Sequence, residues 1–258
     1  MLNATPITGT LGAKVTGVDL LTGDNELVGE IKAALSRYKV LVIEDQQALD
    51  PPTLLSFAES FGVAERAQHP TWDDVPGTVG VKLIHAKNDR IGPDVENSWH
   101  TDGATRDNPS WLSFLYAHKV PDYGRDTMFA DMEAAYDRLS PPLQEFLEGL
   151  TALHSWGRQK PGAPPVEHPV ILTDAATGRK TLYVNHGYTR SIVGLRAEES
   201  DALLALLLRQ THVPELQLRV NWRPGTLTIW DNKRVQHALV RDRVSDRVLH
   251  RVMVETTA

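Results

Sequence analysis

Several segments of the chain carry apolar residues at the three- and four-residue spacing of an amphipathic helix. The first follows Asp24, where Leu27, Ile31, Leu35 and Tyr38 recur at this spacing. Asp is a preferred N-cap residue because its carboxylate accepts hydrogen bonds from the first free backbone N–H groups of a helix. The pattern therefore predicts a helix from Asp24 through about Tyr38.

The same reasoning predicts three more helices. The segment DPP at 50–52 is a typical helix start, and Gly62 follows the apolar run as the stop. Two further helices are expected over about 132–150 and over 197–211, where leucines recur on one face.

Short apolar or alternating runs between these helices are typical of strands. They fall at 7–20 (with turns), 39–44, 80–85, 112–118, 126–130, 168–173, 181–185, 217–222, 226–230 and 247–254. The stretches 63–79 and 157–165 lack clear periodicity, as lids and binding loops often do. Many short strands with helices near the N-terminus and between strands predict a mainly β fold, a sandwich or jelly roll with flanking helices. We expect one domain over 1–258.

Composition narrows the classes of protein. The chain has 258 residues, a formal net charge of −6 and no cysteine. Disulfides, zinc–thiolate sites, iron–sulfur clusters and a Cys nucleophile are therefore excluded. The mild acidity gives no reason to expect nucleic-acid or membrane-surface binding. No apolar run reaches the roughly 20 residues of a membrane helix, and MLNATPITGT lacks the features of a signal peptide, so we expect a cytoplasmic protein.

A candidate metal site comes from two distant segments. SWHTDG at 98–103 contains His100 and Asp102, and residues two apart on an extended segment point to the same face. His237 comes much later, after the strand predicted over 226–230. Two histidines and one carboxylate are the ligand set of a non-haem Fe(II) site, and the same set could hold catalytic zinc. An H-x-D triplet alone also arises by chance as a surface pair, so these alternatives stay open.

Two arginines strengthen the metal hypothesis. Arg247 and Arg251 lie four apart on the last predicted strand, so both side chains can share one face, about 13 Å apart along the backbone. Arginine binds carboxylates bidentately. The pattern indicates a metal that chelates one end of a diacid while an arginine binds the other. The alternative is a solvated strand face on which the arginines pair with Asp242, Asp246 or Glu255.

A series of short motifs runs through the chain. They are LGAKVTGVDL, VLVIEDQ, FAESFG, WHTD (Trp99–Asp102), GRDTMFADMEAAYDRLS (Gly124–Ser140), HPV (His168–Val170), GRKTLYVN (Gly178–Asn185), PGTLTIWDNKRVQH (Pro224–His237) and DRVLHRVMV (Asp246–Val254). Together, in this order, they resemble the taurine dioxygenase-like (TauD/TfdA) family of Fe(II)/2-oxoglutarate-dependent dioxygenases over close to the full length. The resemblance implies a double-stranded β-helix, which is a jelly-roll core with flanking helices.

The resemblance also implies roles for individual residues. His100, Asp102 and His237 match the iron ligands. Thr127 matches a threonine that hydrogen-bonds 2-oxoglutarate, and Arg247 matches the arginine that pairs with its distal carboxylate.

The implied substrate side involves four more residues. Arg251 matches an arginine that meets the anionic group of the substrate in taurine dioxygenase, and His69 matches a substrate-contacting histidine. Trp72 stands where that enzyme has tyrosine, and Asn97 lies one residue out of register with a substrate-contacting asparagine. The alternative is that His69 and Asn97 satisfy loop backbone groups and that Trp72 fills the core.

The implied activity is that of an oxidoreductase. Fe(II), 2-oxoglutarate and O2 would hydroxylate, oxidatively cleave or desaturate a small anionic or zwitterionic substrate, with release of succinate and CO2. Three departures make taurine doubtful as the substrate. The interval between Trp156 and His168 is shorter than that enzyme's lid, Gly103 replaces a β-branched residue, and His237 and Arg247 are one residue closer. Because relatives are often dimers or tetramers, a homo-oligomer is one expectation.

Three other interpretations remain on sequence grounds. A zinc hydrolase could use the same three ligands with Glu96 as general base, although Thr127 and Arg247 would then be unexplained. A jelly roll could bind a small ligand without catalysis. Nucleic-acid binding is disfavoured because carboxylates and a net negative charge surround the basic cluster. That cluster comprises Arg234, Arg241, Arg243, Arg247 and Arg251.

Overall fold

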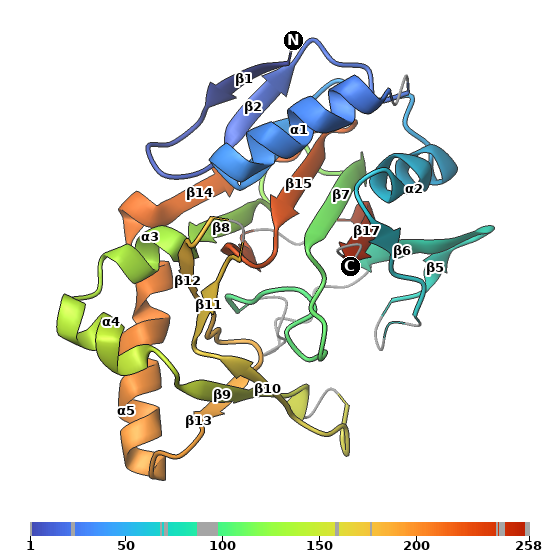
Figure 1. The fold of residues 1–258 in the computed structure, drawn as a ribbon. Coiled ribbons are helices and arrows are strands. Elements are labelled where there is room, and N and C mark those ends of the chain that lie inside the picture. Colours follow the sequence, from blue (N-terminus) through green and yellow to red (C-terminus); the bar gives the residue numbers. More distant parts are fainter. Residues whose placement is uncertain are drawn as a thin grey trace.

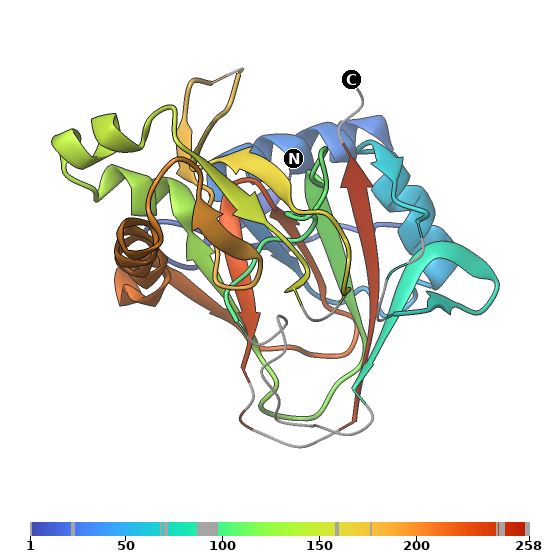
Figure 2. The same ribbon diagram turned by 90° about the horizontal axis from the view of Figure 1, so that it is seen from below.

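Two sheets that pack face to face form the centre of the molecule (Figures 1 and 2), and their strands are antiparallel except for the parallel pair β2-β3. The computed structural model describes residues 2–21, 24–67, 69, 72–86, 98–157, 160–175, 177–240, 242 and 246–255. The large sheet has nine strands in the order β1-β2-β3-β15-β7-β17-β6-β5, with β4 paired to β17. The small facing sheet has the order β14-β8-β16.

The strands of these two sheets come from the whole length of the chain. The large sheet contains β1 (Asn3–Pro6), β2 (Ala13–Thr16), β3 (Val40–Ile43), β4 (Val63–Ala64), β5 (Asp74–Val75), β6 (Thr78–Ala86), β7 (Leu112–Lys119), β15 (Leu227–Asp231) and β17 (Arg247–Glu255). The small sheet contains β8 (Thr127–Asp131), β14 (Gln217–Val220) and β16 (Val235–Leu239). The predicted jelly-roll core with flanking helices is confirmed.

Strand alternation separates the two faces of the large sheet. On β15, Ile229 belongs to the apolar cluster under the helices, whereas Trp230 belongs to the cluster between the sheets. On β7, Phe114 and Leu115 divide in the same way. Successive side chains of a strand point to opposite faces, so each strand supplies both cores.

Two helices cover the outer face of the large sheet (Figure 1). They are α1 (Asn25–Tyr38) and α2 (Pro51–Glu59). Both begin as predicted, because Asp24 accepts the Leu27 N–H at 2.7 Å and Asp50 accepts the Thr53 N–H at 2.9 Å. The second helix ends at Glu59, before the predicted Gly62. Among the described residues no helix has both the length and the apolar character needed to cross a membrane.

A third apolar cluster lies beyond the small sheet. It is built by α3 (Met132–Asp137), α4 (Pro141–Leu147), α5 (Ala197–Leu208), the 3₁₀ segments η3 (Arg209–His212) and η4 (Pro214–Leu216), the sheet β10-β9-β13, and the pair β11-β12. Those strands are β9 (Thr151–His154), β10 (Val166–Pro169), β11 (Ile171–Thr173), β12 (Lys180–Leu182) and β13 (Thr189–Ile192).

Several predicted boundaries were wrong for local reasons. The helix expected over 132–150 is two helices, because the prolines at 141 and 142 start a new one. The strand expected over 168–173 is divided at Val170 between two sheets. The aperiodic stretch 63–79 contains β4, β5 and the start of β6. Strands β9, β13 and β16 were missed because their sequences, TALH, TRSI and VQHAL, contain no continuous apolar run.

A buried ion pair ties the first helix to the small sheet. Arg234 donates from Nε and Nη2 to the two Glu133 oxygens at 2.6 and 2.9 Å, and from Nη1 to the Ser36 carbonyl at 2.9 Å. Burial opposes ionisation of Glu133, but Arg234 outweighs it and lowers the pKa of that carboxyl group.

We therefore expect Arg234→Met to lower the free energy of unfolding by about 1.5–3 kcal/mol, because it removes two charge-assisted hydrogen bonds from a buried carboxylate. Among the described residues, Glu133 then keeps only the longer contacts with Lys39 at 3.5 Å and Arg179 at 3.8 Å. Denaturant melts at pH 7 measure this change. The control is Arg196→Met. The Arg196 side chain is 80% exposed beside Glu199, so its removal should lower the free energy of unfolding by under about 1 kcal/mol. Equal losses in the two variants would contradict the assigned role of the buried pair.

Candidate active site

Two histidines face each other across the edge of the small sheet. His237 lies on β16, and His100 pairs with it as an isolated antiparallel bridge. The His100 N–H donates to the His237 carbonyl at 3.0 Å, and the His237 N–H donates to the His100 carbonyl at 2.9 Å. Because directly opposed residues project their side chains to the same side, the ring centroids lie 4.2 Å apart.

The third member of the cluster follows two residues after His100. Asp102 lies where the extended segment enters a turn, and Gly103 has a φ of +75°. A Cβ atom on Gly103 would lie 2.8 Å from the Ser110 backbone nitrogen. Both features require glycine, which explains why no β-branched residue follows the carboxylate here.

The three side chains bring one ligand atom each within 4.8 Å of one another, and all three are buried. Asp102 Oδ1 lies 4.0 Å from His100 Nε2, and Asp102 Oδ2 lies 3.9 Å from His237 Nε2. The His100 Nδ1 atom bonds the Ser98 carbonyl at 2.9 Å, so Nδ1 carries the proton and Nε2 offers its lone pair.

The charges of the cluster suit a divalent metal. Burial, above all, lowers the pKa of His100 and lowers that of His237 to about 3, so both rings are neutral near pH 7. Burial opposes ionisation of Asp102, but Arg251 and the two histidines outweigh it and lower the pKa of that carboxyl group. Two neutral imidazoles and one carboxylate on one side of a cavity fit a 2-His-1-carboxylate site.

A chain of hydrogen bonds fixes the Asp102 carboxylate. Arg251 Nη1 donates to Oδ1 at 2.9 Å, and Ser113 Oγ donates to Oδ2 at 2.8 Å. Behind Ser113, Asn232 Nδ2 donates to its Oγ at 2.8 Å, and Trp230 Nε1 donates to Asn232 Oδ1 at 2.7 Å. Each group has a partner, so the carboxylate is held by residues of β7, β15 and β17 at once.

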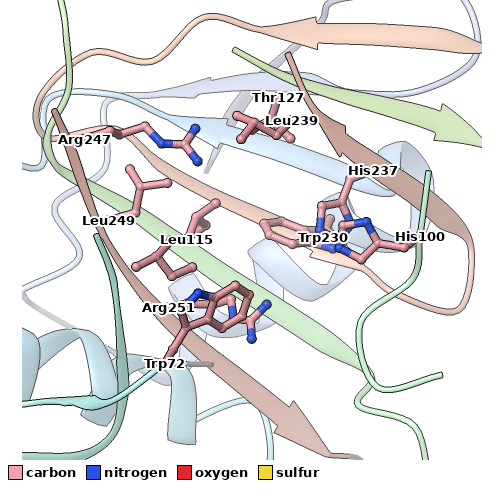
Figure 3. A pocket seen from close by; sticks show the side chains of 11 residues that line it. Trp72, His100, Leu115, Thr127, Trp230, His237, Leu239, Arg247, Leu249 and Arg251 are labelled. Atoms are coloured by element: carbon pink, nitrogen blue, oxygen red, sulfur yellow. The ribbon is translucent and has the colours of Figure 1, made fainter. Parts of the chain in front are cut away.

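A narrow pocket lies between the two sheets beside the cluster (Figure 3). Arg247 points toward Thr127 and Leu239 at one end, and Arg251 lies against Trp72 at the other. Arg247, Leu249 and Arg251 line it together because they alternate along β17. Its full lining is Trp72, Ile84, His100, Leu115, Thr127, Trp230, His237, Leu239, Arg247, Leu249 and Arg251.

The two polar groups at the Arg247 end are oriented by neighbouring residues. Arg247 Nη1 donates to the Arg125 carbonyl at 2.9 Å. Trp222 Nε1 donates to Thr127 Oγ1 at 3.0 Å. Because the Thr127 oxygen is the acceptor in that bond, its own hydrogen is available to an acceptor in the pocket.

Aromatic side chains cover the Arg251 end. The Arg251 guanidinium lies 4.1 Å from the Trp72 ring centroid, and His69 stacks on Trp72 at 4.2 Å. Trp156 meets His69 edge-on at 5.8 Å. Burial and then the charge of Arg251 lower the pKa of His69 to about 3, against the opposing effect of Asp102. This stack brings three of the four predicted substrate-side residues together: Arg251, Trp72 and His69.

Both predicted arginines are buried, with 6% and 3% of their surfaces exposed, so the solvated-face alternative is wrong. The partners proposed in that alternative pair with other residues: Asp242 with Arg219, Asp246 with His85 and Lys119, and Glu255 with Arg106. A nucleic-acid role for Arg234 is excluded by its burial against Glu133. Asn97 and Glu96 lie outside the described residues.

Sequence reasoning identified Arg251 but missed two other residues that position the Asp102 carboxylate, Ser113 and Asn232. Ser113 is a polar residue in a buried apolar strand, a signal that could have singled it out. Asn232 directly follows the strand predicted over 226–230 and Asp231, and its side chain reaches Ser113.

Comparison with known proteins gives a consistent result. The model of the family described as "Taurine catabolism dioxygenase TauD, TfdA family" matches residues 3–253. The chain is 34% identical to an alkylsulfatase of Acinetobacter baylyi, over 92% of this chain and 79% of that protein. It is 33% identical to an alpha-ketoglutarate-dependent sulfate ester dioxygenase of Pseudomonas putida, over 97% of this chain and 88% of that protein. It is 32% identical to an alpha-ketoglutarate-dependent sulfonate dioxygenase of Saccharomyces cerevisiae, over 93% of this chain and 63% of that protein.

Solved structures agree with the sequence matches. A putative alpha-ketoglutarate-dependent taurine dioxygenase from Burkholderia xenovorans superposes with a TM-score of 0.90 at 31% identity, covering 100% of this chain and 93% of that one. AAD-2 in complex with Mn(II) and N-oxalylglycine superposes with a TM-score of 0.83 at 26% identity, covering 100% and 98%.

We expect Ser113→Ala to weaken Mn(II) binding by about 10- to 100-fold, because a metal-facing carboxylate loses its orienting donor. The electron paramagnetic resonance signal of free Mn(II) measures this affinity without turnover. Ser110→Ala is the matched control, because this serine is also fully buried but its Oγ has no partner in the described part of the chain. An unchanged affinity in Ser113→Ala would contradict the positioning role.

Proposed function

The chain belongs to the TauD, TfdA family of dioxygenases, and on this premise we propose that it oxidises a small anionic compound of the sulfate ester or sulfonate class. It is a 2-oxoglutarate-dependent non-haem iron oxidoreductase, with Fe(II), 2-oxoglutarate and O2 as its cofactors. The main support for this proposal is that two buried arginines on one strand face line the same pocket as His100 and His237, the two histidines of the metal cluster. We further propose that residues 1–258 form one such domain.

Three residues would hold the iron. His100, Asp102 and His237 offer two neutral imidazoles and a carboxylate, and no other group of this kind occurs in the part of the chain that the structure describes. When bound, iron together with 2-oxoglutarate and O2 supplies the oxidising power for attack on a C–H bond, with release of succinate and CO2. The protein contributes orientation of the reactants and exclusion of side reactions.

The Arg247 end of the pocket suits the distal carboxylate of 2-oxoglutarate. Arg247 is buried and oriented by the Arg125 carbonyl, and the Thr127 hydrogen is available to an acceptor. A guanidinium and a hydroxyl group that converge in a buried pocket form charge-assisted hydrogen bonds with a carboxylate.

The Arg251 end suits the anionic group of the substrate. Nη1 of Arg251 bonds Asp102, whereas its Nε has no hydrogen-bond partner among the described residues. This buried donor can bind a sulfate or sulfonate oxygen, and the rings of Trp72 and His69 offer an apolar surface for the attached carbon chain. Three of the relatives act on alkyl sulfates, sulfate esters or sulfonates by their names.

The proposed reaction places a hydroxyl group on the carbon bonded to oxygen or sulfur. One oxygen atom of O2 becomes bonded to this carbon, and the other is incorporated into succinate. The hydroxylated carbon then forms an aldehyde, its C–O or C–S bond breaks, and sulfate or sulfite leaves together with a proton. A hydrolase that used the same ligands would need neither O2 nor 2-oxoglutarate, so omitting either one separates the two reactions.

We expect Arg247→Met to raise the KM for 2-oxoglutarate by about 10- to 150-fold, because hydrogen bonds to a charged group contribute roughly 1.5–3 kcal/mol. Succinate release against 2-oxoglutarate concentration gives this value. The exposed Arg209 provides the control variant, Arg209→Met. An unchanged KM in Arg247→Met would refute the assignment of this end of the pocket.

The substrate proposal is tested with hexyl sulfate, hexanesulfonate and taurine, with neutral hexanol as the comparison. We expect O2- and 2-oxoglutarate-dependent release of sulfate or sulfite, faster from the hexyl compounds than from taurine. Arg251→Lys keeps a charge but loses the planar stack on Trp72, and should raise the substrate KM by about 10-fold or more. Equal turnover of hexanol and hexyl sulfate by the unmodified protein would refute an anion-selective pocket.

A further inference from the structure

A second cavity lies on the other side of strand β15 from the iron pocket, which is the pocket that His100 and His237 line. Its volume is about 510 Å³, within the roughly 300–1,000 Å³ typical of small-molecule sites. Adjacent residues of β15 divide the two spaces, because Trp230 lines the iron pocket and Asp231 lines this cavity. The other walls come from β11, β12 and the segment 107–111.

Two buried side chains line the cavity with polar atoms that lack partners. Tyr183 is 2% exposed and His168 is 7% exposed, with ring centroids 5.6 Å apart. Neither Tyr183 Oη nor His168 Nε2 has a hydrogen-bond partner among the described residues. A buried polar group without a partner costs about 1–3 kcal/mol, so these two atoms indicate a ligand.

The tautomer of His168 decides what its free nitrogen can bind. The backbone carbonyls of Ala104 and Arg106 accept from this ring and favour its protonated form, but burial outweighs them and lowers the pKa of His168. The ring is therefore neutral near pH 7. Since Nε2 is the atom without a partner, Nδ1 carries the hydrogen and Nε2 presents a lone pair to the cavity.

A buried carboxylate completes the wall. Asp231 is 8% exposed and receives only the Lys233 backbone N–H at 2.9 Å and the Trp111 indole N–H at 3.4 Å in the described structure. Burial and then the charge of Asp231 raise the pKa of Tyr183, so its hydroxyl group stays protonated near pH 7. The carboxylate, the imidazole lone pair and the phenol oxygen are three hydrogen-bond acceptors that line the same cavity.

The surrounding charges favour a cation. Two more carboxylates, Asp107 and Asp174, stand at the exposed rim. Arg234 also lines the cavity and makes two bonds to Glu133, and its charge, like that of Lys233, lowers the pKa of Asp231 against the larger opposing effect of burial. Lys233 is the remaining basic residue of the lining. The indole of Trp111 and the phenol ring of Tyr183 add aromatic faces, which attract cations.

We propose that this cavity binds a small organic molecule through a primary ammonium group. Such a group has three N–H donors, and the cavity lining offers three acceptors on Asp231, His168 and Tyr183. The volume leaves room for a short carbon chain against Trp111 and Leu172. The site is separate from the iron pocket and goes beyond the proposed oxidation.

Isothermal titration calorimetry of the full chain with 2-phenylethylammonium tests the proposal. We expect binding to one site, at least about 10-fold tighter than that of the neutral comparison 2-phenylethanol and of the anion 3-phenylpropionate, because the bond to a carboxylate is charge-assisted. Asp231→Asn should weaken ammonium binding by about 10-fold or more. Tyr183→Phe should weaken it by about 3- to 10-fold.

Tyr183→Phe keeps the test decisive if Asp231→Asn disturbs the fold, because it removes only a hydroxyl group without a partner in the described structure. Asp201→Asn on the exposed side of α5 is the matched control and should bind as the unmodified chain does. The proposal is overturned if the ammonium and neutral compounds bind equally, if neither binds, or if Tyr183→Phe and Asp231→Asn leave the affinity unchanged.

Discussion

The buried carboxylate of Asp102 is the constraint on which the site depends. An unpaired charge in a protein interior costs several kcal/mol, so the fold must surround it with partners. Arg251 on β17 and Ser113 on β7 supply them, and Asn232 after β15 holds Ser113 in turn. Three neighbouring strands of the large sheet thus converge on one side chain. The pairing of His100 with His237 then brings both imidazoles to the same carboxylate.

The same arrangement explains how one strand can serve two ligands. Because side chains alternate along β17, Arg247 and Arg251 face the pocket with Leu249 between them. His100 and His237 of the proposed iron site line the same pocket. The proposed cosubstrate and substrate sites are therefore separated by the rigid spacing of a strand rather than by loops. Precise spacing of this kind is what orientation of reactants requires.

The sequence predicted the parts of this structure that local chemistry determines. Both capping aspartates, the apolar strands and the alternation that points Arg247 and Arg251 inward are local signals. Strands such as β9 and β16 were missed, because they carry no continuous apolar run and their stability comes from pairing with other segments. The Asn232–Ser113–Asp102 chain was also missed, because it joins residues that are 119 and 11 positions apart in sequence. Even where His100, Asp102 and His237 were identified, their convergence depended on tertiary pairing.

Anaerobic titration of the full chain with Fe(II), followed by 2-oxoglutarate, tests the central claim most directly. The visible charge-transfer band of the iron chelate reports the metal, its open positions and the cosubstrate together. We predict a band that saturates at one equivalent of each and is absent from His237→Ala. Iron binding without a band, or an equal band in His237→Ala, would contradict the account.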